Sequence, residues 1–203
     1  MKCYGGGSER SVENGEGRPP PRFSGRSLVN ELDEVDFIYQ AGALRRVERS
    51  GWKTIGIKPE SVSEHSYRAA IIAYILARKE GVNPEKAVLA ALFHDLHEVR
   101  ISDIHIVGKR YLKIDEEGAV RDTFSALPEI MELFRDKKIM EIAHDADRLE
   151  LVFQAKEYRD LGNKYVGQWI ERASALLKTE SAKRMAKEAL ERDSFKWLFE
   201  ARG

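Results

Sequence analysis

The sequence is poor in the features that mark secreted and membrane proteins. Cys3 is the single cysteine among 203 residues, so the chain cannot form an intramolecular disulfide. Cysteine-poor chains are typical of a reducing compartment, and we expect a cytoplasmic protein. No apolar run approaches the roughly 18 residues of a membrane-spanning helix, and the N-terminus lacks the apolar segment of a signal peptide.

An excess of charge of either sign is also absent. Lys and Arg together number 34, as do Asp and Glu, which gives a formal net charge of +0. Without bulk positive charge, the chain gives no reason to expect a nucleic-acid or membrane partner. With 42% hydrophobic residues, a chain of this length can bury about 70% of its unfolded surface. We therefore expect a single core.

Residues 1–26 differ in composition from the rest of the chain. They hold six of the fifteen glycines and three of the six prolines, with few large apolar side chains. Such a segment cannot bury enough apolar surface to offset the entropy that it would lose on ordering. We expect a flexible N-terminal tail over residues 1–26 and one helical domain over residues 27–203.

Strand patterns of period two are lacking, whereas apolar residues recur at steps of three and four. This spacing predicts an all-α fold, a compact helical bundle. Residues 101–115, which are mixed in composition and contain glycine, are predicted to form a loop. The predicted helices cover residues 27–41, 61–79, 84–95, 116–126, 128–136, 138–160, 167–177 and 180–200.

The helix predicted over 84–95 carries the clearest functional signal. Asn83 is a good N-cap, and Pro84 suits the first helical position. Residues 87–93 are apolar on every face, so we expect this helix to lie inside the domain. His94 and Asp95 follow directly, and an uncompensated buried charge is costly. These two side chains must therefore be paired, hydrogen-bonded or bound to a metal ion.

A metal site is favoured by the positions of the other candidate ligands. His65 lies in the first turn of a second apolar helix, and it meets His94 and Asp95 if the two helices are antiparallel neighbours. An oxygen ligand from a later helix would complete a set of two histidines and two acids suited to a divalent transition metal. Glu98 follows Asp95 by three residues on the same helical side, where it could orient or deprotonate a water.

Together these residues resemble the H…HD…D signature of the HD-domain metal-dependent phosphohydrolases. The segments ESVSEHSY at 60–67, HDxxE at 94–98 and SDI at 102–104 are similar to the 5′-deoxynucleotidase group that includes the HDDC-type proteins. The similarity covers roughly residues 28–163. It implies an α-helical bundle, usually a homodimer, that removes phosphate from deoxynucleoside 5′-monophosphates with one divalent metal ion such as Mn or Co.

The late aspartate is either Asp145 or Asp147. The helical period places them about 80° and about 120° from the middle of the apolar stripe, so it does not select Asp147. In the family pattern the ligand precedes a Gln-Ala-x-Glu-Tyr-like segment by seven residues. This segment begins here at Gln154, which points to Asp147. Glu150 and Glu157 lie on the apolar side and could support the site. The resemblance thus implies the metal ligands His65, His94, Asp95 and Asp147.

Other family positions match less evenly. Glu98 and Asp103 match acidic residues that act in catalysis or substrate binding, and Trp52 matches a tryptophan that lines the nucleotide pocket. Bacterial members carry an arginine just before this tryptophan, whereas this chain has Gly51, so selection of the 2′-deoxy sugar is open. Packing for Trp52, a helix-end acid for Glu98 and capping for Asp103 are the competing interpretations.

Two other functions compete with a nucleoside monophosphatase. Another HD phosphohydrolase would cut a cyclic dinucleotide, a nucleoside triphosphate or ppGpp, but this chain has little room for the regulatory elements that such enzymes often carry. A metal- and nucleotide-binding sensor without turnover is the second alternative. The presence of Glu98 and of all four implied ligands weighs against it, because a sensor would most easily lose one of them.

Overall fold

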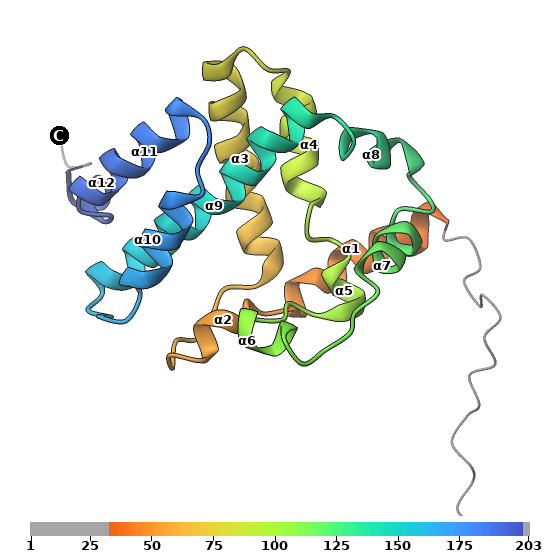
Figure 1. Ribbon diagram of the computed structural model, residues 1–203, viewed down its shortest axis with the longest axis horizontal. Coiled ribbons are helices and arrows are strands. Elements are labelled where there is room, and N and C mark those ends of the chain that lie inside the picture. The colour runs from red at the N-terminus through yellow and green to blue at the C-terminus, as the bar shows by residue number, and fades with distance from the viewer. Residues whose placement is uncertain (1–32, 201–203) are drawn as a thin grey trace, which may run out of the picture. The chain divides into compact units, whose positions relative to one another are not determined.

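The computed structural model describes residues 33–200, and within this range it contains helices and no strand (Figure 1). The predicted all-α fold is therefore confirmed. An isolated antiparallel bridge joins Glu48 to Ser61. The tail predicted over residues 1–26 lies outside the described residues. No helix of the described range is long and apolar enough to cross a bilayer.

Three helices pack against one another at the centre of the domain: α3 (Val62–Glu80), α4 (Pro84–Phe93) and α9 (Lys137–Asp160). The side of α4 that faces its neighbours is made of alanines, which let the three helix backbones approach closely. Removal of this apolar surface from water is the main stabilising contribution. The buried members of this core include Ala73, Leu76, Ala87, Ala90, Ala91, Ile142, Ala146, Leu149 and Val152.

The turn between α3 and α4 follows from local sequence signals. α3 begins with a capping box, in which the Ser61 side chain accepts the backbone N–H of Glu64 and the Glu64 carboxylate accepts that of Ser61. It ends at Gly81, whose φ of 68° is left-handed. The Asn83 side chain then caps α4. The connection is so short that the two helices run antiparallel, which brings the start of α3 to the end of α4.

Shorter helices surround the three central ones. Phe37 in α1, Phe93 at the end of α4 and Phe124 after α7 form a second cluster, with ring centroids 6.1–6.2 Å apart. α10 and α11 pack against α9. The remaining elements are α1 (Glu34–Ala43), η1 (Leu44–Arg46), α2 (Ser50–Lys53), α5 (Glu98–Ile101), α6 (Ile106–Lys109), α7 (Glu116–Thr123), α8 (Pro128–Leu133), α10 (Gly167–Ala175), α11 (Glu180–Glu191) and α12 (Lys196–Glu200).

Two predicted segments differ from the structure in the number of helices that they contain. The single helix predicted over 180–200 is two helices, α11 and α12. It breaks because the Asp193 side chain accepts the backbone N–H of Phe195, and Ser194 donates from its backbone and its hydroxyl to Asp160. The loop predicted over 101–115 contains the one-turn helix α6, whose start is capped by the His105 side chain.

The prediction that α4 is enclosed on all sides is wrong. Leu89 and Leu92 are 39% and 38% exposed, and Ile71 and Tyr74 on α3 are 45% and 44% exposed. The buried alanines of α4 face α3 and α9, whereas its leucines face outward. α4 is therefore apolar on every face although one face of the α3–α4 pair is exposed.

Candidate metal centre

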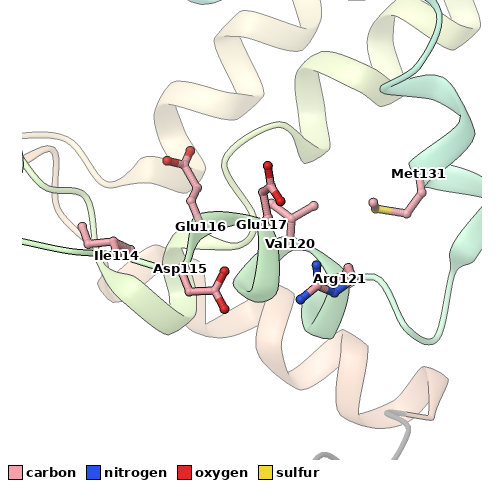
Figure 2. Close-up of a pocket in the computed structure, with 7 residues that line it drawn as sticks. All are labelled: Ile114, Asp115, Glu116, Glu117, Val120, Arg121 and Met131. Carbon is pink, nitrogen blue, oxygen red and sulfur yellow. The ribbon is translucent and has the colours of Figure 1, made fainter.

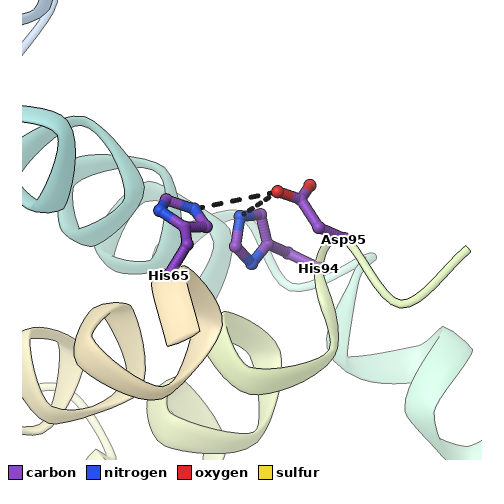
Figure 3. A group of neighbouring side chains, drawn as sticks. All are labelled: His65, His94 and Asp95. Carbon is purple, nitrogen blue, oxygen red and sulfur yellow. Dashed lines mark ion pairs between the residues drawn. The ribbon is translucent and has the colours of Figure 1, made fainter. Parts of the chain in front are cut away.

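Two helix ends bring His65, His94 and Asp95 together. His65 lies in the first turn of α3, His94 ends α4, and Asp95 follows it. The three side chains point toward one another (Figure 3). His94 Nε2 is 3.1 Å from Asp95 Oδ2, and His65 Nε2 is 3.7 Å from the same oxygen. Each residue thus offers one ligand atom, and the three atoms lie within 4.8 Å of one another.

Asp147 of α9 lies beside this group, whereas Asp145 does not. Asp147 Oδ1 is 3.2 Å from His65 Nε2 and 3.8 Å from His94 Nε2. Asp145 is fully buried and accepts the backbone N–H groups of Lys178 and Thr179 at 2.9 and 2.7 Å, together with the Thr179 hydroxyl at 2.8 Å. Its carboxylate therefore holds the start of α11 against α9.

In both histidines one ring nitrogen is hydrogen-bonded and the other is available to bind a metal ion. His94 Nδ1 is 2.7 Å from the Ala91 carbonyl oxygen, and His65 Nδ1 is 2.5 Å from Glu150 Oε2. The two Nε2 atoms are buried and have no hydrogen-bond partner among the described residues. A buried nitrogen without a partner is costly, so its place in a fold needs a reason. Two such nitrogens beside two carboxylates fit a divalent transition-metal ion.

The charges at the centre favour a cation. Burial opposes the charged forms, but His94 and His65 lower the pKa of Asp95 and of Asp147 well below the usual range. Burial likewise opposes a charged His94, yet Asp95 and Asp147 raise its pKa well above the usual value. Such an arrangement stabilises positive charge, which either protons or a metal ion can supply.

Glu98 lies one turn beyond Asp95, at the start of α5. It is 8% exposed, and its Oε2 has no hydrogen-bond partner within the described part of the chain. Burial, followed by the charges of Asp95 and Asp103, raises the pKa of Glu98 to about 8. A carboxyl group that exchanges a proton near neutral pH is suited to proton transfer.

Asp103 and Arg49 connect the short helix α2 to this centre. Asp103 Oδ2 accepts the backbone N–H of Ser50 at 2.7 Å and so fixes the start of α2. Arg49 directly precedes Ser50, and Arg49 Nη1 is 3.4 Å from Asp95 Oδ2. Burial lowers the pKa of Arg49, but Asp95 and Asp147 outweigh burial and keep the side chain charged. Sequence reasoning missed Arg49, because nothing local shows that α2 folds back onto a residue 46 positions later.

Trp52 is 1% exposed in the structure. Its indole N–H donates to Glu60 at 2.8 Å, and its ring packs against Tyr158 and Trp169 with centroid distances of 5.2 and 5.4 Å. These contacts hold α2 in place beside the centre. That Trp52 lines the nucleotide pocket stays a prediction.

A cavity of about 720 Å³ lies beside α7 (Figure 2). None of the residues that line it is a candidate ligand. Three of its lining side chains are carboxylates and one is a cation, a balance that does not suit an anionic substrate. We therefore do not place the substrate there. The cavity is lined by Ile114, Asp115, Glu116, Glu117, Val120, Arg121 and Met131.

The start of α3, the end of α4 and the middle of α9 thus bring two histidines and two aspartates together in a helical bundle. Residues 41–189 match the HD-domain family model, and the chain belongs to this family. It is 34% identical over 160 residues to the 5′-deoxynucleotidase HDDC2 of Bos taurus. The match covers 72% of this chain and 76% of that protein. The corresponding Mus musculus protein is 33% identical, with coverage of 63% and 71%.

Among solved structures, a conserved hypothetical protein from Pyrococcus furiosus is 35% identical. The match covers 78% of this chain and 99% of that chain, with a TM-score of 0.65. The family resemblance predicted from the sequence is therefore confirmed.

Proposed function

We propose that this protein is a metal-dependent phosphohydrolase that releases phosphate from nucleoside 5′-monophosphates, including deoxynucleotides. The observation that carries the proposal is the convergence, from three helices, of two carboxylates and two imidazole nitrogens that make no hydrogen bond among the described residues. The substrate class comes from relatives that are named 5′-deoxynucleotidases.

The ligands of the divalent ion would be His65, His94, Asp95 and Asp147. An ion bound there supplies Lewis-acid chemistry, which offsets negative charge on the phosphoryl group and makes water more acidic. Mn or Co is our expectation, since nitrogen and oxygen donors in equal number accommodate these ions.

Glu98 and Asp103 supply the proton chemistry in this proposal. Glu98 Oε2 is buried and has no hydrogen-bond partner among the described residues, so the ionised form of Glu98 can take a proton from the attacking water. Asp103 holds α2 through the backbone of Ser50, and we propose that its other oxygen grips the sugar or assists the leaving 5′-oxygen. By fixing the start of α2, Asp103 would also hold Trp52 of that helix in place beside the site.

Arg49 balances the negative charge of the site. Its side chain is 16% exposed, and its guanidinium makes one hydrogen bond within the described residues, to Asp95. The remaining N–H groups are donors of the kind that bind phosphate oxygens. We propose that Arg49 helps to hold the substrate phosphate and the charge that develops on it.

We also propose a homodimer in the cytoplasm. α3 and α4 pack together, and both expose apolar side chains: Tyr67, Ile71 and Tyr74 on α3, and Leu89 and Leu92 on α4. We propose that these side chains form one apolar surface. Apolar patches of this kind are typical of protein interfaces, and a second copy of the chain would cover it by two-fold symmetry. The single cysteine supports a reducing compartment.

Phosphate release tests this function. Metal-stripped protein is supplied with Mn, Co, Mg or Zn and given ribo- and deoxynucleoside 5′-monophosphates, beside a cyclic dinucleotide, a nucleoside triphosphate and ppGpp. We expect metal-dependent release from monophosphates and at least a 100-fold loss in Asp147→Asn. Glu141→Gln, an exposed acid on the same helix, is the matched control and should keep activity.

Three results would point elsewhere. Turnover of another phosphoester alone would replace the proposed substrate class. Binding of metal and nucleotide without any turnover would indicate a sensor. Equal activity in Asp147→Asn and wild type would remove the proposed metal set.

A further inference from the structure

A polar cluster that the proposed chemistry does not use lies behind His65, at the contact of α3 with α9. Glu150 is its centre and is 1% exposed. Glu150 Oε2 is 2.5 Å from His65 Nδ1, on the side of the ring away from the other candidate ligands. Glu150 Oε1 accepts from Arg68 Nε at 2.8 Å and from Arg68 Nη2 at 2.6 Å. Each carboxylate oxygen thus has its own partner.

Arg68 is held in turn by two further acceptors on α9. Its Nη1 donates to Glu157 Oε1 at 2.8 Å, and its Nη2 also donates to Gln154. The Arg68 side chain is 29% exposed, whereas Glu150 and His65 are buried. A chain of charge-assisted hydrogen bonds therefore runs from a partly exposed guanidinium to a buried imidazole.

The donor and acceptor capacities of these groups determine which nitrogen of His65 carries the proton. A guanidinium has donors only, so Glu150 Oε1 must accept. An ionised carboxylate has acceptors only, so Oε2 must receive a proton from His65 Nδ1. A neutral imidazole that donates from Nδ1 presents a lone pair at Nε2, the atom that faces Asp95 and Asp147.

We propose that Arg68 and Glu150 set the tautomer of His65 and thereby keep its Nε2 as a metal-binding lone pair. This inference rests on the proposed role of His65 as a metal ligand. His94 reaches the same state through the Ala91 carbonyl oxygen, which is a fixed backbone acceptor. His65 depends instead on two side chains, so its tautomer can be changed by substitution. Arg68 and Glu150 are positioning residues, since they act on the ion through His65.

Glu150→Gln changes the tautomer of His65 while it keeps the packing around it almost unchanged. The glutamine has almost the same shape but one acceptor oxygen and one amide donor. Arg68 is charged and takes the oxygen, so the amide donor faces His65 Nδ1 and forces it to accept. The ring proton then lies on Nε2 and points at the metal position. We expect affinity for Mn or Zn to fall roughly 10- to 100-fold or more.

Removal of Arg68 from the same variant gives the decisive comparison. In Glu150→Gln combined with Arg68→Met, the glutamine oxygen has no guanidinium to serve and can accept from His65 Nδ1. We expect the double variant to bind the ion at least about 5-fold more tightly than Glu150→Gln alone, because the Nδ1–H tautomer returns. If the two residues only supported packing, two losses would add and the double variant would be the weaker one.

The control replaces a different arginine on α3. Arg78 is exposed and lies over the Tyr74 ring, away from Glu150. Arg78→Met combined with Glu150→Gln should bind the ion as weakly as Glu150→Gln alone. Rescue by Arg78→Met as well would overturn the proposal, since it would show a general effect of lost charge.

Two measurements give the answer without an activity assay. Competition with a chelator gives the affinity of each variant for Zn or Mn. Proton–nitrogen NMR of the Zn-loaded protein, labelled with ¹⁵N at histidine, reports the proton on His65 Nδ1. We expect this signal far downfield in wild type and in the double variant, and its loss in Glu150→Gln. Its absence from wild type would overturn the proposal even if no variant folds.

The failure of this inference differs from the failure of the proposed function. Wild-type protein that binds no divalent ion would refute the metal site, and the inference with it. Tight binding by wild type with equal affinity in Glu150→Gln would overturn the tautomer role alone and leave the proposed function standing.

Discussion

Asp145 and Asp147 are two residues apart on α9 and have different surroundings. Asp145 is buried and accepts hydrogen bonds from Lys178 and Thr179, whereas Asp147 faces His65 and His94. The sequence period alone left both open, because each lies off the apolar stripe. The partners of Asp145 come from the connection between α10 and α11, which local patterns do not locate.

Asp145→Asn should therefore lower stability and leave the metal site intact. An amide donor would replace one of the acceptor oxygens that serve Lys178 and Thr179, at a cost of about 1–3 kcal/mol in the free energy of unfolding. Urea denaturation measures this cost, and metal titration of the folded variant should match wild type. Loss of metal binding in folded Asp145→Asn would contradict our assignment.

Glu98 gives a pH dependence whose sign follows from its environment. Its pKa in the folded protein is raised to about 8 by burial and by Asp95 and Asp103, from the ordinary glutamate value of 4.5. The unfolded chain thus releases this proton at lower pH than the folded one, so the stability contribution present below pH 4.5 is lost as pH rises toward about 8.

Glu98→Gln removes this penalty. In metal-free protein we expect the variant to gain little at pH 5 and on the order of 3 kcal/mol at pH 8.5 relative to wild type. Urea denaturation in the presence of a chelator at both values measures the difference. An equal effect at the two values would show that the Glu98 carboxyl titrates normally.

At the scale of the elements, the sequence predicted the helices with clear end signals. The capping residues Ser61 and Asn83 and the left-handed Gly81 define the antiparallel α3–α4 pair that brings the ligands together. The approach of α2 could not be predicted, because it depends on contacts between distant residues such as Ser50 and Asp103. Asp193 and Ser194 were a local signal for the break between α11 and α12. The prediction of a single helix followed the apolar periodicity instead.

The cap of α3 also positions His65, which lies one turn further along. Ser61→Ala removes the acceptor for the Glu64 backbone N–H and should cost about 1 kcal/mol in the free energy of unfolding. Ser174→Ala is the matched control, since its buried hydroxyl has no hydrogen-bond partner among the described residues. Thermal denaturation compares the two. A larger loss in Ser174→Ala than in Ser61→Ala would contradict the role of the cap.

At the scale of the whole molecule, the sequence predicted one helical domain of the HD family. It overestimated how far that domain encloses its apolar helices, because composition does not show which face of α3 or α4 lacks a partner. The uncovered surface is the structural basis for the proposed homodimer.

A charge placed on that surface should separate the dimer. Ile71→Glu would desolvate a carboxylate at the α3–α4 face, and we expect a monomer by sedimentation velocity at concentrations where wild type is a dimer. Trp197→Glu is the control, since this residue is 72% exposed on α12. A monomeric wild type, or dissociation by Trp197→Glu alone, would place the interface elsewhere or remove it.

The most direct test of the account is anomalous diffraction from crystals grown with Co²⁺ or Zn²⁺. We expect a metal peak within roughly 2.3 Å of His65 Nε2, His94 Nε2 and one oxygen each of Asp95 and Asp147. A peak bonded to other residues, or no peak between the two histidines at saturating metal, would contradict the central claim that these four side chains form the metal centre.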